Sequence, residues 1–458
     1  MESTLMQAAK SMQGELHGID TLFRGVSTDT RTLREGELFF ALHGPNFDGR
    51  EFVVAAATKQ AVAAVVDKPV DAEIANITVD DTRVALGKLA ASWRKKMPAR
   101  VIAITGSNGK TTVKEMVASC LSQGASTLAT QGNLNNDIGL PLMLLRLGRE
   151  HEYGVFELGA NRPNEIACLA AMAQPHVVLI TNAAAAHLQG FGSIAGVARA
   201  KGEILQSQQA PECAILNRDD EYYDLWKSMA KGMAILSFGM TSQADMQATQ
   251  IRSTSNGSAF TLVLPDTTLE ISLPLAGTRN VLNACAAAAA STALGISPAQ
   301  IKEGLEKVQP VSGRLQAIDG LRGIHLFDDS YNANPASVIA AAEFIAAKQG
   351  ESWLVLGDMA ELGADAALLH ESVGQAVREA GISRLFTTGK QARRTSAAFG
   401  ENAEWIGSVS DLAEALIAAL KSSPPEPAAI NVLVKGSRSM QMERVVSALM
   451  RAFKGQGK

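Results

Sequence analysis

The feature that most constrains the fold is a glycine-containing segment that directly follows an apolar run. Four apolar residues at 101–104 precede Thr-Gly-Ser-Asn-Gly-Lys-Thr-Thr at 105–112. The run suits a β-strand buried on both faces, and apolar residues recur at helical spacing after the segment, at Val113, Met116, Val117, Cys120 and Leu121. The segment therefore predicts a strand–turn–helix unit, which is the building block of a parallel α/β sheet.

This turn is typical of a nucleotide phosphate site. At a helix N-terminus, unpaired backbone N–H groups and the positive end of the helix dipole favour a bound anion. Lys110 can neutralise the β and γ phosphates, and the Thr111 hydroxyl can bind Mg²⁺. The GxxGKTT spacing is not that of a standard Walker A motif, because Ile104 stands where that motif has its first glycine. The alternative to a phosphate site is a simple βα turn that happens to contain a lysine. The combination of a buried strand, two glycines and an amphipathic helix disfavours this alternative.

Length and composition narrow the class of protein. The chain has 458 residues, which suits two to four domains, and we expect three. Its 47% hydrophobic residues, 19% charged residues and net charge of −4 indicate an ordinary globular protein and imply no nucleic-acid partner. The sequence contains no convincing membrane span and no secretion signal. We therefore expect a cytoplasmic protein without membrane insertion, and a monomer.

The cysteines agree with a reducing compartment. The four lie in apolar contexts without CxxC spacing, which favours reduced core thiols over disulfides or a zinc site; they are Cys120, Cys168, Cys213 and Cys285.

The pattern along the chain predicts three α/β domains. Residues 1–85 contain short apolar runs separated by turns, which indicates a small α/β domain. Residues 86–313 contain the phosphate loop and further strand candidates at 154–158 and 177–181, alternating with helical patterns. This alternation predicts a central domain with a doubly wound parallel sheet. The turn-rich stretch at 243–274 predicts β structure at the margin of that sheet.

Residues 314–458 repeat the alternation and predict a Rossmann-like third domain. Its clearest helix is expected at 411–421, where leucines recur at intervals of four. Its strand candidates lie at 324–327, 353–356, 385–388 and 430–434.

Two polar residues of the central domain follow expected strands. In open α/β sheets, ligands lie beyond the carboxyl ends of the strands. Glu157 ends an apolar strand and could hold Mg²⁺ near the phosphates, with a helix-capping or surface glutamate as the alternative. His187 is the only plausible metal ligand of the small-residue loop after Thr181. A lone histidine is usually a satisfied hydrogen-bonding group, so this second assignment is weak by itself.

Lys201 lies on the apolar face of the next expected helix, together with Val197, Ala198 and Leu205. The stem of such a lysine commonly buries while the amine reaches water. Alternatively, desolvation and neighbouring cations lower its pKa, and the neutral amine adds CO₂ to become an anionic carbamate ligand. The residues leave both alternatives open.

Two more polar groups could contact a nucleotide or a substrate. Asn280 and Asn283 are three residues apart at an expected helix start, so they share a face and could contact an adenine edge or serve as an ordinary N-cap. The run Asp-Asp-Ser-Tyr-Asn-Ala-Asn-Pro at 328–335 follows an expected strand. Its density of polar groups favours a substrate or ATP contact from the third domain, with a structural Asx turn as the alternative.

Together these residues resemble the Mur ligases, the ATP-dependent amide-forming enzymes of bacterial peptidoglycan synthesis, over essentially the whole chain. The resemblance implies ATP contacts at Thr105, Gly106, Ser107, Asn108, Gly109, Lys110, Thr111, Thr112, Asn280, Asn283 and Arg314. It implies two Mg²⁺ ions, held by Thr111, Glu157, His187 and a carbamylated Lys201. The implied catalytic residues are Lys110, Glu157, His187, Lys201 and Asp329. Relatives commonly carry His-Asn where this chain has Arg279-Asn280, so a role for that histidine does not transfer.

Several strings are similar to those of the family member that joins D-alanyl-D-alanine to a UDP-N-acetylmuramoyl tripeptide. They lie at 29–31, 46–49, 132–139, 329–335 and 436–440. The resemblance implies that the first domain binds the UDP-sugar, the central domain ATP and the third domain the dipeptide. The implied substrate contacts are Ser27, Asp29, Thr30, Arg31, Asn46, Asp48, Asn133, Asn135, Asn136, Tyr331, Asn332, Asn334, Ser437 and Arg438.

The resemblance also implies a reaction. The tripeptide carboxylate attacks the γ phosphorus of ATP to give an acyl phosphate, which the dipeptide amine converts to the amide, with release of phosphate. A folylpolyglutamate synthase shares the ATP core but lacks a UDP-sugar domain before it. A nucleotide-driven switch would leave Lys201 and the cluster at 329–335 unexplained. The ligase that adds the third residue is a further alternative, and only the strings above favour the last step over it.

Overall fold

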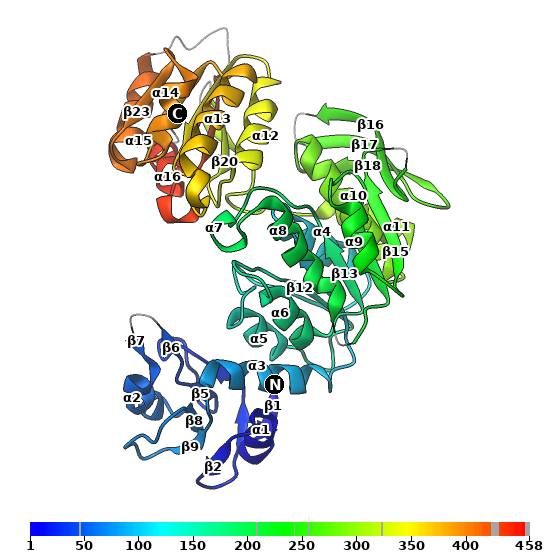
Figure 1. Ribbon diagram of the computed structural model, residues 1–458, viewed down its shortest axis with the longest axis vertical. Helices are drawn as coiled ribbons and strands as arrows, with labels where there is room; N and C mark the ends of the chain where they lie inside the picture. Colours follow the sequence, from blue (N-terminus) through cyan, green and yellow to red (C-terminus); the bar gives the residue numbers. More distant parts are fainter. Residues whose placement is uncertain are drawn as a thin grey trace.

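The computed structural model describes residues 1–44, 47–207, 209–241, 243–254, 257–321, 324–422 and 430–453. It contains three α/β regions that follow one another along the chain (Figure 1). The first region (blue) lies at one end of the molecule, the central region (cyan to green) in the middle, and the third (yellow to red) at the other end. The predicted three-domain α/β architecture is confirmed.

The first domain is built on a five-stranded sheet in the order β2-β9-β8-β5-β4, in which only β2 is antiparallel to its neighbour. The strands are β2 (Glu15–His17), β4 (Val26–Ser27), β5 (Leu38–Phe40), β8 (Ala63–Val66) and β9 (Ala75–Thr78). Two small antiparallel pairs accompany it, β1 (Glu2–Thr4) with β3 (Leu22–Arg24), and β6 (His43–Gly44) with β7 (Phe47–Asp48). Its helices are α1 (Leu5–Met12), the 3₁₀ turn η1 (Gly49–Phe52) and α2 (Val53–Thr58).

The central domain contains a nine-stranded sheet in the order β11-β12-β10-β13-β14-β15-β16-β17-β18. Neighbours are parallel as far as β16, and β17 and β18 continue as antiparallel strands. The last three strands therefore form the marginal β structure predicted at 243–274. The strands are β10 (Arg100–Thr105), β11 (Thr127–Ala129), β12 (Tyr153–Glu157), β13 (Val177–Ile180), β14 (Cys213–Asn217), β15 (Ala234–Gly239), β16 (Met246–Thr254), β17 (Gly257–Val263) and β18 (Thr268–Leu273).

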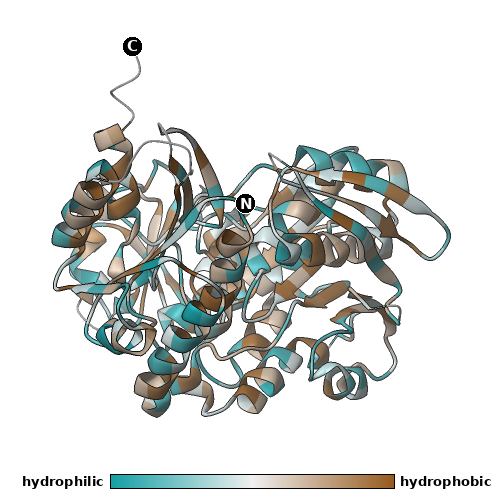
Figure 2. Ribbon diagram, turned by 90° about the horizontal axis from the view of Figure 1, so that it is seen from above, coloured by the Kyte–Doolittle hydropathy of each residue, from teal (hydrophilic) through white to brown (hydrophobic). Residues whose placement is uncertain are grey.

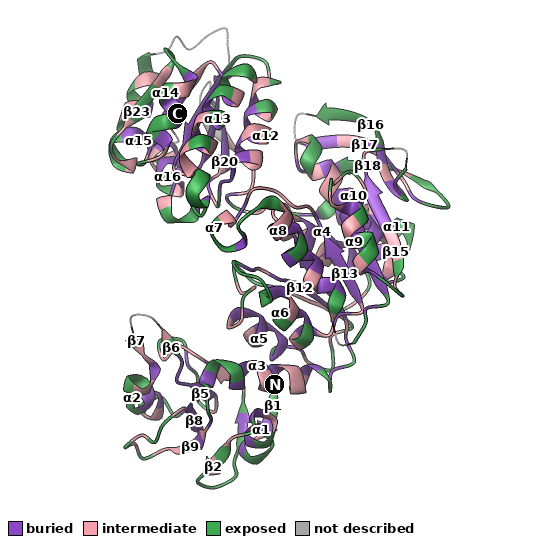
Figure 3. Ribbon diagram, in the orientation of Figure 1, coloured by how far each residue is buried: buried purple, intermediate pink, exposed green. Residues whose placement is uncertain are grey.

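Helices cover both faces of this sheet, because successive side chains of a strand point to opposite faces. On β10, Val101 and Ala103 enter the core shared with α3, α5 and α6, whereas Ile102 and Ile104 enter the core shared with α4, α10 and α11. In Figure 3 the central strands are largely buried, and the helices that flank them have exposed outer faces, as expected for a doubly wound sheet. The helices are α3 (Thr82–Arg94), α4 (Lys110–Leu121), α5 (Gly139–Leu144), α6 (Glu165–Ala173), α7 (Leu188–Phe191), α8 (Ile194–Gly202), η2 (Glu203–Gln206), α9 (Tyr223–Met229), α10 (Thr278–Ala293) and α11 (Pro298–Lys307).

Helix α3 connects the first two domains. It packs on α1 of the first domain and on α5 and α6 of the central domain. The boundary that we place between residues 85 and 86 falls inside this helix. The domain division itself stays a prediction.

The third domain has a six-stranded sheet in the order β19-β20-β24-β21-β22-β23, parallel except for β19. Along β21, Trp353 and Val355 enter one core and Leu354 and Leu356 the other, so helices cover this sheet on both faces too. Figure 2 shows strands with brown, hydrophobic segments and helices that carry both teal and brown segments. The elements are β19 (Gln316–Leu321), β20 (Ile324–Asp329), α12 (Pro335–Ala346), β21 (Glu351–Leu356), η3 (Gly363–Asp365), α13 (Ala366–Glu379), β22 (Arg384–Thr388), α14 (Ala392–Phe399), β23 (Ala403–Ile406), α15 (Val409–Ser422), β24 (Ile430–Lys435), η4 (Arg438–Met440) and α16 (Glu443–Phe453).

The cysteine prediction is partly wrong. All four thiols are free, and Cys120, Cys213 and Cys285 are buried, but Cys168 is exposed on α6. Its position falls on the outer face of that helix, which the apolar neighbours in the sequence do not reveal. No helix among the described residues is long and apolar enough to cross a membrane.

Candidate functional site

A cavity of about 2040 Å³ lies between the central and third domains. Residues from both domains line it, and none of its lining residues belongs to the first domain's sheet. The sequence-predicted residues that line it are Ser107, Asn108, Gly109, Lys110, Thr112, Asn133, Asn135, Asn136, Glu157, His187, Lys201, Asn280, Asn283, Arg314, Asp329, Tyr331, Asn332, Asn334, Ser437 and Arg438.

The phosphate loop joins β10 to α4 at one wall of this cavity. Gly109 has a φ of 83°, in the left-handed region that glycine tolerates, and no side chain caps the helix that follows. A Cβ atom on Gly106 would lie 1.9 Å from Thr181 Oγ1, so only glycine fits against the neighbouring strand end. Thr105 is buried, and its hydroxyl donates to the Leu158 carbonyl at 2.9 Å, so this residue supports the loop from behind.

Asn182 fixes the loop, and it is a residue that the sequence interpretation missed. Its Oδ1 accepts from the Asn108 N–H at 3.0 Å, and its Nδ2 donates to the Asn108 carbonyl at 3.1 Å. The Thr181 hydroxyl donates to the same carbonyl at 2.6 Å. The available signal was the position of Asn182 just beyond strand β13, where ligand-facing polar residues are expected.

Lys110 lies at the start of α4, with its Nζ donating to the Gly106 carbonyl at 2.7 Å. Burial lowers the pKa of this lysine, Glu157 opposes that effect, and Arg314 adds to it. The loop therefore holds a cation over a helix N-terminus, an arrangement that suits a polyphosphate.

Thr111 and Glu157 bring two oxygen donors together beside the loop. The Thr111 hydroxyl donates to Glu157 Oε2 at 2.9 Å, and Asn135 Nδ2 donates to Glu157 Oε1 at 2.9 Å. Hydroxyl and carboxylate oxygens are the ligands that Mg²⁺ prefers, and Mg²⁺ bound to a nucleotide needs only one or two of them because phosphates and waters supply the rest. The residues present therefore fit a Mg²⁺ ion, although the described residues contain no group of three His, Cys, Asp or Glu side chains arranged around one metal.

Lys201 is buried on the inner face of α8, with 1% of its surface exposed, yet it lines the cavity. Its Nζ lies 5.5 Å from the centroid of the Phe191 ring. Burial first, and then the charge of Lys110, lower the pKa of Lys201 to about 7. A large fraction of the amine is therefore neutral and nucleophilic near neutral pH.

His187 contacts Glu361 of the third domain through its Nδ1. This contact lowers the pKa of the Glu361 carboxyl, mainly through the hydrogen bond from the imidazole. The Gln189 N–H also donates to the Glu361 carbonyl at 3.2 Å. The histidine thus connects two domains, and the sequence carries no signal for its acidic partner.

Other contacts from the third-domain side reach the phosphate loop directly. Asn334 Nδ2 donates to Asn108 Oδ1 at 2.7 Å, and Arg314 Nη2 donates to the Thr111 hydroxyl at 3.3 Å. The Arg314 guanidinium also lies 4.1 Å from the centroid of the Tyr331 ring. Asn334 additionally forms a capping box with Ser337 at the start of α12. The segment after β20 is therefore both a helix cap and an interdomain contact.

Asp329 forms an ion pair with Lys435, a second residue that the sequence interpretation missed. Lys435 Nζ lies 2.6 Å from Asp329 Oδ2 and donates to the Asn332 carbonyl at 2.9 Å. Burial lowers the pKa of Lys435, while Asp329 opposes that effect. The lysine ends strand β24 directly before the motif at 436–440, so strand-end position was again the usable signal.

Two residues of the motif at 436–440 lie in different environments. Ser437 is buried and accepts from the Ala360 N–H at 2.6 Å, whereas Arg438 is exposed and pairs with Glu443 at 2.9 Å. Ser437 therefore orients the loop that carries Glu361.

Asn280 and Asn283 lie on one face of α10, as predicted, and Asn283 Nδ2 donates to Asn280 Oδ1 at 3.3 Å. A Cβ atom on Gly109 would lie 2.6 Å from Asn283 Oδ1, so this side chain packs directly against the phosphate loop. The preceding residue, Arg279, donates to the Ala336 carbonyl of the third domain at 3.2 Å.

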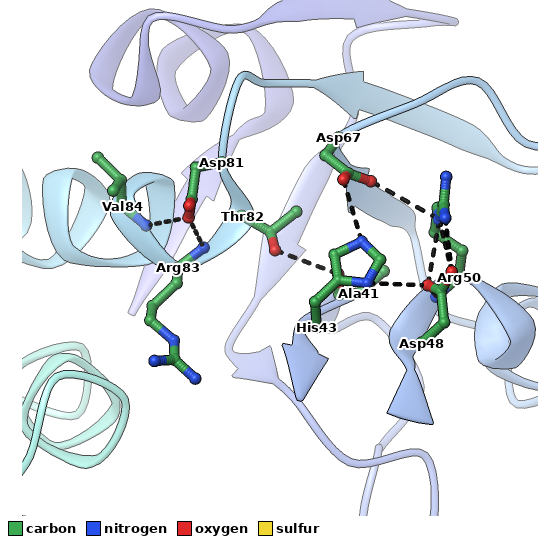
Figure 4. A network of polar contacts seen from close by, with 9 residues as sticks. All are labelled: Ala41, His43, Asp48, Arg50, Asp67, Asp81, Thr82, Arg83 and Val84. Carbon is green, nitrogen blue, oxygen red and sulfur yellow. Dashed lines mark hydrogen bonds and ion pairs between the residues drawn. The ribbon is translucent and has the colours of Figure 1, made fainter. Parts of the chain in front are cut away.

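The predicted first-domain residues lie away from this cavity. Ser27 and Asp29 form a local turn, since Asp29 N donates to Ser27 Oγ at 3.2 Å, and Asp29 pairs with Arg31 at 2.7 Å. Thr30 lies in the same turn. Asp48 is part of a second cluster around hairpin β6–β7 (Figure 4). Asn46 lies outside the described residues.

Comparisons with known proteins cover nearly the whole chain. It matches the Mur ligase family catalytic domain over residues 22–94, the Mur ligase middle domain over 104–291 and the Mur ligase glutamate ligase domain over 313–438. An Escherichia coli protein named UDP-N-acetylmuramoyl-tripeptide–D-alanyl-D-alanine ligase is 45% identical over 447 residues, which is 97% of this chain and 98% of that protein.

Two solved structures are also similar. MurF from Acinetobacter baumannii is 37% identical, with a TM-score of 0.93 over 98% of this chain and 99% of its own. MurF from Thermotoga maritima in complex with ADP is 25% identical, with a TM-score of 0.82 over 95% of this chain and 99% of its own.

Proposed function

Because the chain belongs to the Mur ligase family, we infer that it is the ATP-dependent ligase that joins D-alanyl-D-alanine to a UDP-N-acetylmuramoyl tripeptide. The products are the pentapeptide precursor of peptidoglycan, ADP and phosphate. The observation that carries this conclusion is the cavity in which the phosphate loop of the central domain meets Arg314 and Asn334. ATP and a second substrate can therefore meet there.

An amide does not form from a carboxylate and an amine in water without activation. In this ligase the tripeptide carboxylate attacks the γ phosphorus of ATP and the bond from that phosphorus to the β–γ bridging oxygen breaks, so ADP leaves as the acyl phosphate forms. The dipeptide amine then attacks the acyl carbon, the C–O bond to phosphate breaks, and the amine gives up its proton as the amide forms. Catalysis rests on positioning and charge stabilisation, with Lys110 and Arg314 as the cations at the transferred phosphoryl group.

Thr111 and Glu157 are the residues that would hold Mg²⁺ beside the phosphates. The ion supplies charge neutralisation at the phosphoryl oxygens when it is bound. We assign His187 and a carbamylated Lys201 to a second ion. The neutral amine of Lys201 supports this assignment, since CO₂ adds to an uncharged amine. His187 would bind this ion through Nε2, because its contact with Glu361 is made through Nδ1 and a metal-ligating histidine commonly donates its other ring N–H to a carboxylate.

We assign the remaining predicted residues to the two substrates according to the domain in which they lie. The first domain, with Ser27, Asp29, Thr30, Arg31 and Asp48, binds the UDP-sugar. The loop with Asn133, Asn135 and Asn136 receives the peptide. The third domain, with Asp329, Tyr331, Asn332, Ser437 and Arg438, receives D-alanyl-D-alanine. Closure of the third domain on the central domain would exclude water from the acyl phosphate.

A cytoplasmic location and a monomeric state stay predictions. The location follows from the need for ATP and a nucleotide-linked sugar as substrates.

An ADP-release assay tests the proposed function. We expect ADP release only when UDP-N-acetylmuramoyl tripeptide and D-alanyl-D-alanine are both present, with one pentapeptide formed per ADP. The control is the same assay with the tripeptide replaced by the UDP-sugar dipeptide and the second substrate by diaminopimelate or lysine. Turnover in that control alone would reassign the chain to the ligase that adds the third residue. ADP release without any amine would favour a nucleotide-driven switch.

A further inference from the structure

Asp329 and Lys435 lie side by side at the carboxyl ends of two neighbouring parallel strands. Asp329 ends β20, Lys435 ends β24, and the register of the two strands pairs these residues directly. Lys435 is buried, with 3% of its surface exposed. Its Nζ donates to Asp329 Oδ2 at 2.6 Å and to the Asn332 carbonyl at 2.9 Å. The strand order of the third domain therefore builds this ion pair.

The second carboxylate oxygen of Asp329 holds the segment that joins the central domain to the third domain. Asp329 Oδ1 accepts from the Leu315 N–H at 3.1 Å, and the Tyr331 N–H donates to the Gly313 carbonyl at 3.2 Å. Leu315 has a φ of 51°, in the left-handed region that is unfavourable for a residue with a side chain. The hydrogen bond to Asp329 helps to hold the backbone in this conformation.

Arg314 lies between these two anchored residues, and its guanidinium contacts the central domain. Its Nη2 donates to the Thr111 hydroxyl at 3.3 Å, and the guanidinium lies 4.1 Å from the centroid of the Tyr331 ring. Its Nε is buried and has no hydrogen-bond partner within the described part of the chain. The guanidinium thus keeps a free donor, although Asp329 binds the backbone N–H of the very next residue.

Lys435 explains why Asp329 does not pair with Arg314. An arginine close to a carboxylate readily forms a forked ion pair with it. Here the two oxygens of Asp329 are taken by Lys435 and by the Leu315 N–H. Burial is the main cause that lowers the pKa of both Lys110 and Lys435, and the charge of Arg314 adds to it in both cases. The guanidinium therefore lies within electrostatic range of both amines.

Without the Lys435 amine, Asp329 would be a largely buried carboxylate that lacks its cation. Such a charge is costly, so a nearby cation is drawn to it. Arg314 can reach it by a turn of its side chain, since the adjacent residue is already bound to Asp329. That turn would take the guanidinium away from the Thr111 hydroxyl and from the phosphate loop.

We propose that Lys435 is a positioning residue for phosphoryl transfer, which binds Asp329 so that the Arg314 guanidinium stays directed at the phosphate loop. This inference rests on the proposed function, in which Arg314 is a cation at the transferred phosphoryl group. Lys435 acts through Arg314 and makes no contact with the reacting atoms in this assignment. Its loss should therefore slow the reaction and leave the binding of the dipeptide unchanged.

A double-mutant cycle between Lys435→Met and Arg314→Ala tests this role. Arg314→Ala should lower kcat about a hundredfold, and Lys435→Met about tenfold, because the second variant displaces the guanidinium without removing it. If the lysine acts through the arginine, the double variant should lose no more activity than Arg314→Ala alone. Two independent losses would instead multiply to about a thousandfold.

The KM for D-alanyl-D-alanine separates a positioning role from direct substrate binding. Lys435→Met should keep this KM within about twofold of the native value while kcat falls. A lysine that bound the carboxylate of the dipeptide would show the opposite behaviour. Its loss would raise the KM and leave kcat near the native value at saturating dipeptide.

Asn431→Ala is the matched control for general damage to the third domain. Asn431 is a buried polar residue on the same face of β24, at the other end of the strand, and its Nδ2 donates to the Gln349 carbonyl at 3.0 Å. Any fall in kcat in this variant should multiply with that of Arg314→Ala. Thermal unfolding checks that all variants are folded. If Lys435→Met is not stably folded, Lys435→Gln takes its place in the same cycle, because its amide is uncharged but can still donate to Asp329.

Losses that multiply in the double variant would overturn the role of Lys435, as would a native kcat in the single variant or a raised dipeptide KM with a native kcat. Failure of the proposed function looks different. The native protein would then release no ADP when both UDP-N-acetylmuramoyl tripeptide and D-alanyl-D-alanine are present.

Discussion

The phosphate loop and hairpin β6–β7 are both short turns assigned to nucleotide substrates, but different forces hold them. The phosphate loop is fixed by hydrogen bonds from Thr181 and Asn182 to the backbone of Asn108. Thr181 is only 2% exposed. The hairpin is held by ion pairs whose side chains are partly in water, since Asp48 is 30% exposed and His43 is 39% exposed.

This difference has consequences for function. Hydrogen bonds in a buried setting hold a geometry tightly, because breaking one leaves an unsatisfied polar group. Exposed ion pairs contribute little each and depend on pH and salt. We therefore expect the phosphate loop to be rigid and the hairpin that we assign to the UDP-sugar to be adjustable. We expect changes in the loop to reduce kcat and changes in the hairpin to affect KM.

The largest effect is expected from Lys110→Ala. This lysine is the cation of the rigid loop, and removing one such group near the transferred phosphoryl group typically costs about a hundredfold or more in rate. Steady-state kcat and far-UV circular dichroism are to be measured together. Lys302→Ala on the exposed face of α11 is the control and should retain native kcat. A native-like kcat in Lys110→Ala would remove the phosphate loop from the mechanism.

Lys201→Ala should also abolish most activity, and short carboxylic acids such as acetate should partly restore it. A carboxylate can occupy the space of the lost carbamate and supply its negative charge. Lys114→Ala is the matched control, because Lys114 is also a buried lysine but its Nζ is already bound to Glu115 and to the Thr130 carbonyl. Acetate should not restore any activity lost in that variant.

The same assignment predicts a dependence on pH and CO₂. The pKa of Lys201 is lowered to about 7, so the neutral amine that reacts with CO₂ predominates above pH 7 and the amine is protonated as the pH falls below it. Removing CO₂ from the buffer should therefore weaken the native enzyme most at mildly acidic pH, where the carbamate reverts to the amine. Absence of both acetate rescue and CO₂ dependence, in folded protein that binds ATP, would eliminate the carbamate.

The phosphate loop and the strands and helices around it were predictable from sequence, because strand, turn and helix signals are local. Strand β10, helix α4 and the inner-face position of Lys201 follow from apolar periodicity alone. The margin of the central sheet was equally visible, because turn residues separate its strands.

What escaped prediction are contacts between residues far apart in the chain. Glu361 meets His187 only because two domains pack together, and no periodicity encodes that pairing. His43 of β6 meets Asp67, which directly follows β8, only because the fold brings these two segments together. Lys435 and Asn182 were detectable in principle, since each lies at or just beyond the carboxyl end of a parallel strand.

A smaller effect is expected from Asn283→Ala. A contact to the adenine base is equally strong in the ground state and the transition state. The KM for ATP should therefore rise by about tenfold, and this rise should exceed the fall in kcat. Because Asn283 also packs against Gly109, a fall in kcat comparable with the rise in KM would show that it supports the loop instead. Asn431→Ala serves as the comparison, because Asn431 also lines the cavity but lies on β24 of the third domain. An unchanged KM for ATP in folded Asn283→Ala would contradict the adenine assignment.

The smallest effect is expected from Arg50→Gln, which removes the η1 arginine that pairs with Asp48 at the end of β7. Arg50 pairs with Asp48 through its side chain, and the substitution leaves that carboxylate with His43 and with the backbone N–H of residue 50, which donates to Asp48 Oδ1 at 2.9 Å. The KM for UDP-N-acetylmuramoyl tripeptide should rise about twofold while kcat and the KM for ATP stay native, since exposed pairs contribute little. The difference from the native protein should shrink as salt is added, because salt screens the native pair. Arg24→Gln is the matched control, an exposed arginine of the same domain paired with Glu2 at 3.5 Å. If Arg50→Gln instead lowers kcat, the hairpin would be coupled rigidly to bond formation, and the contrast with the phosphate loop would fail.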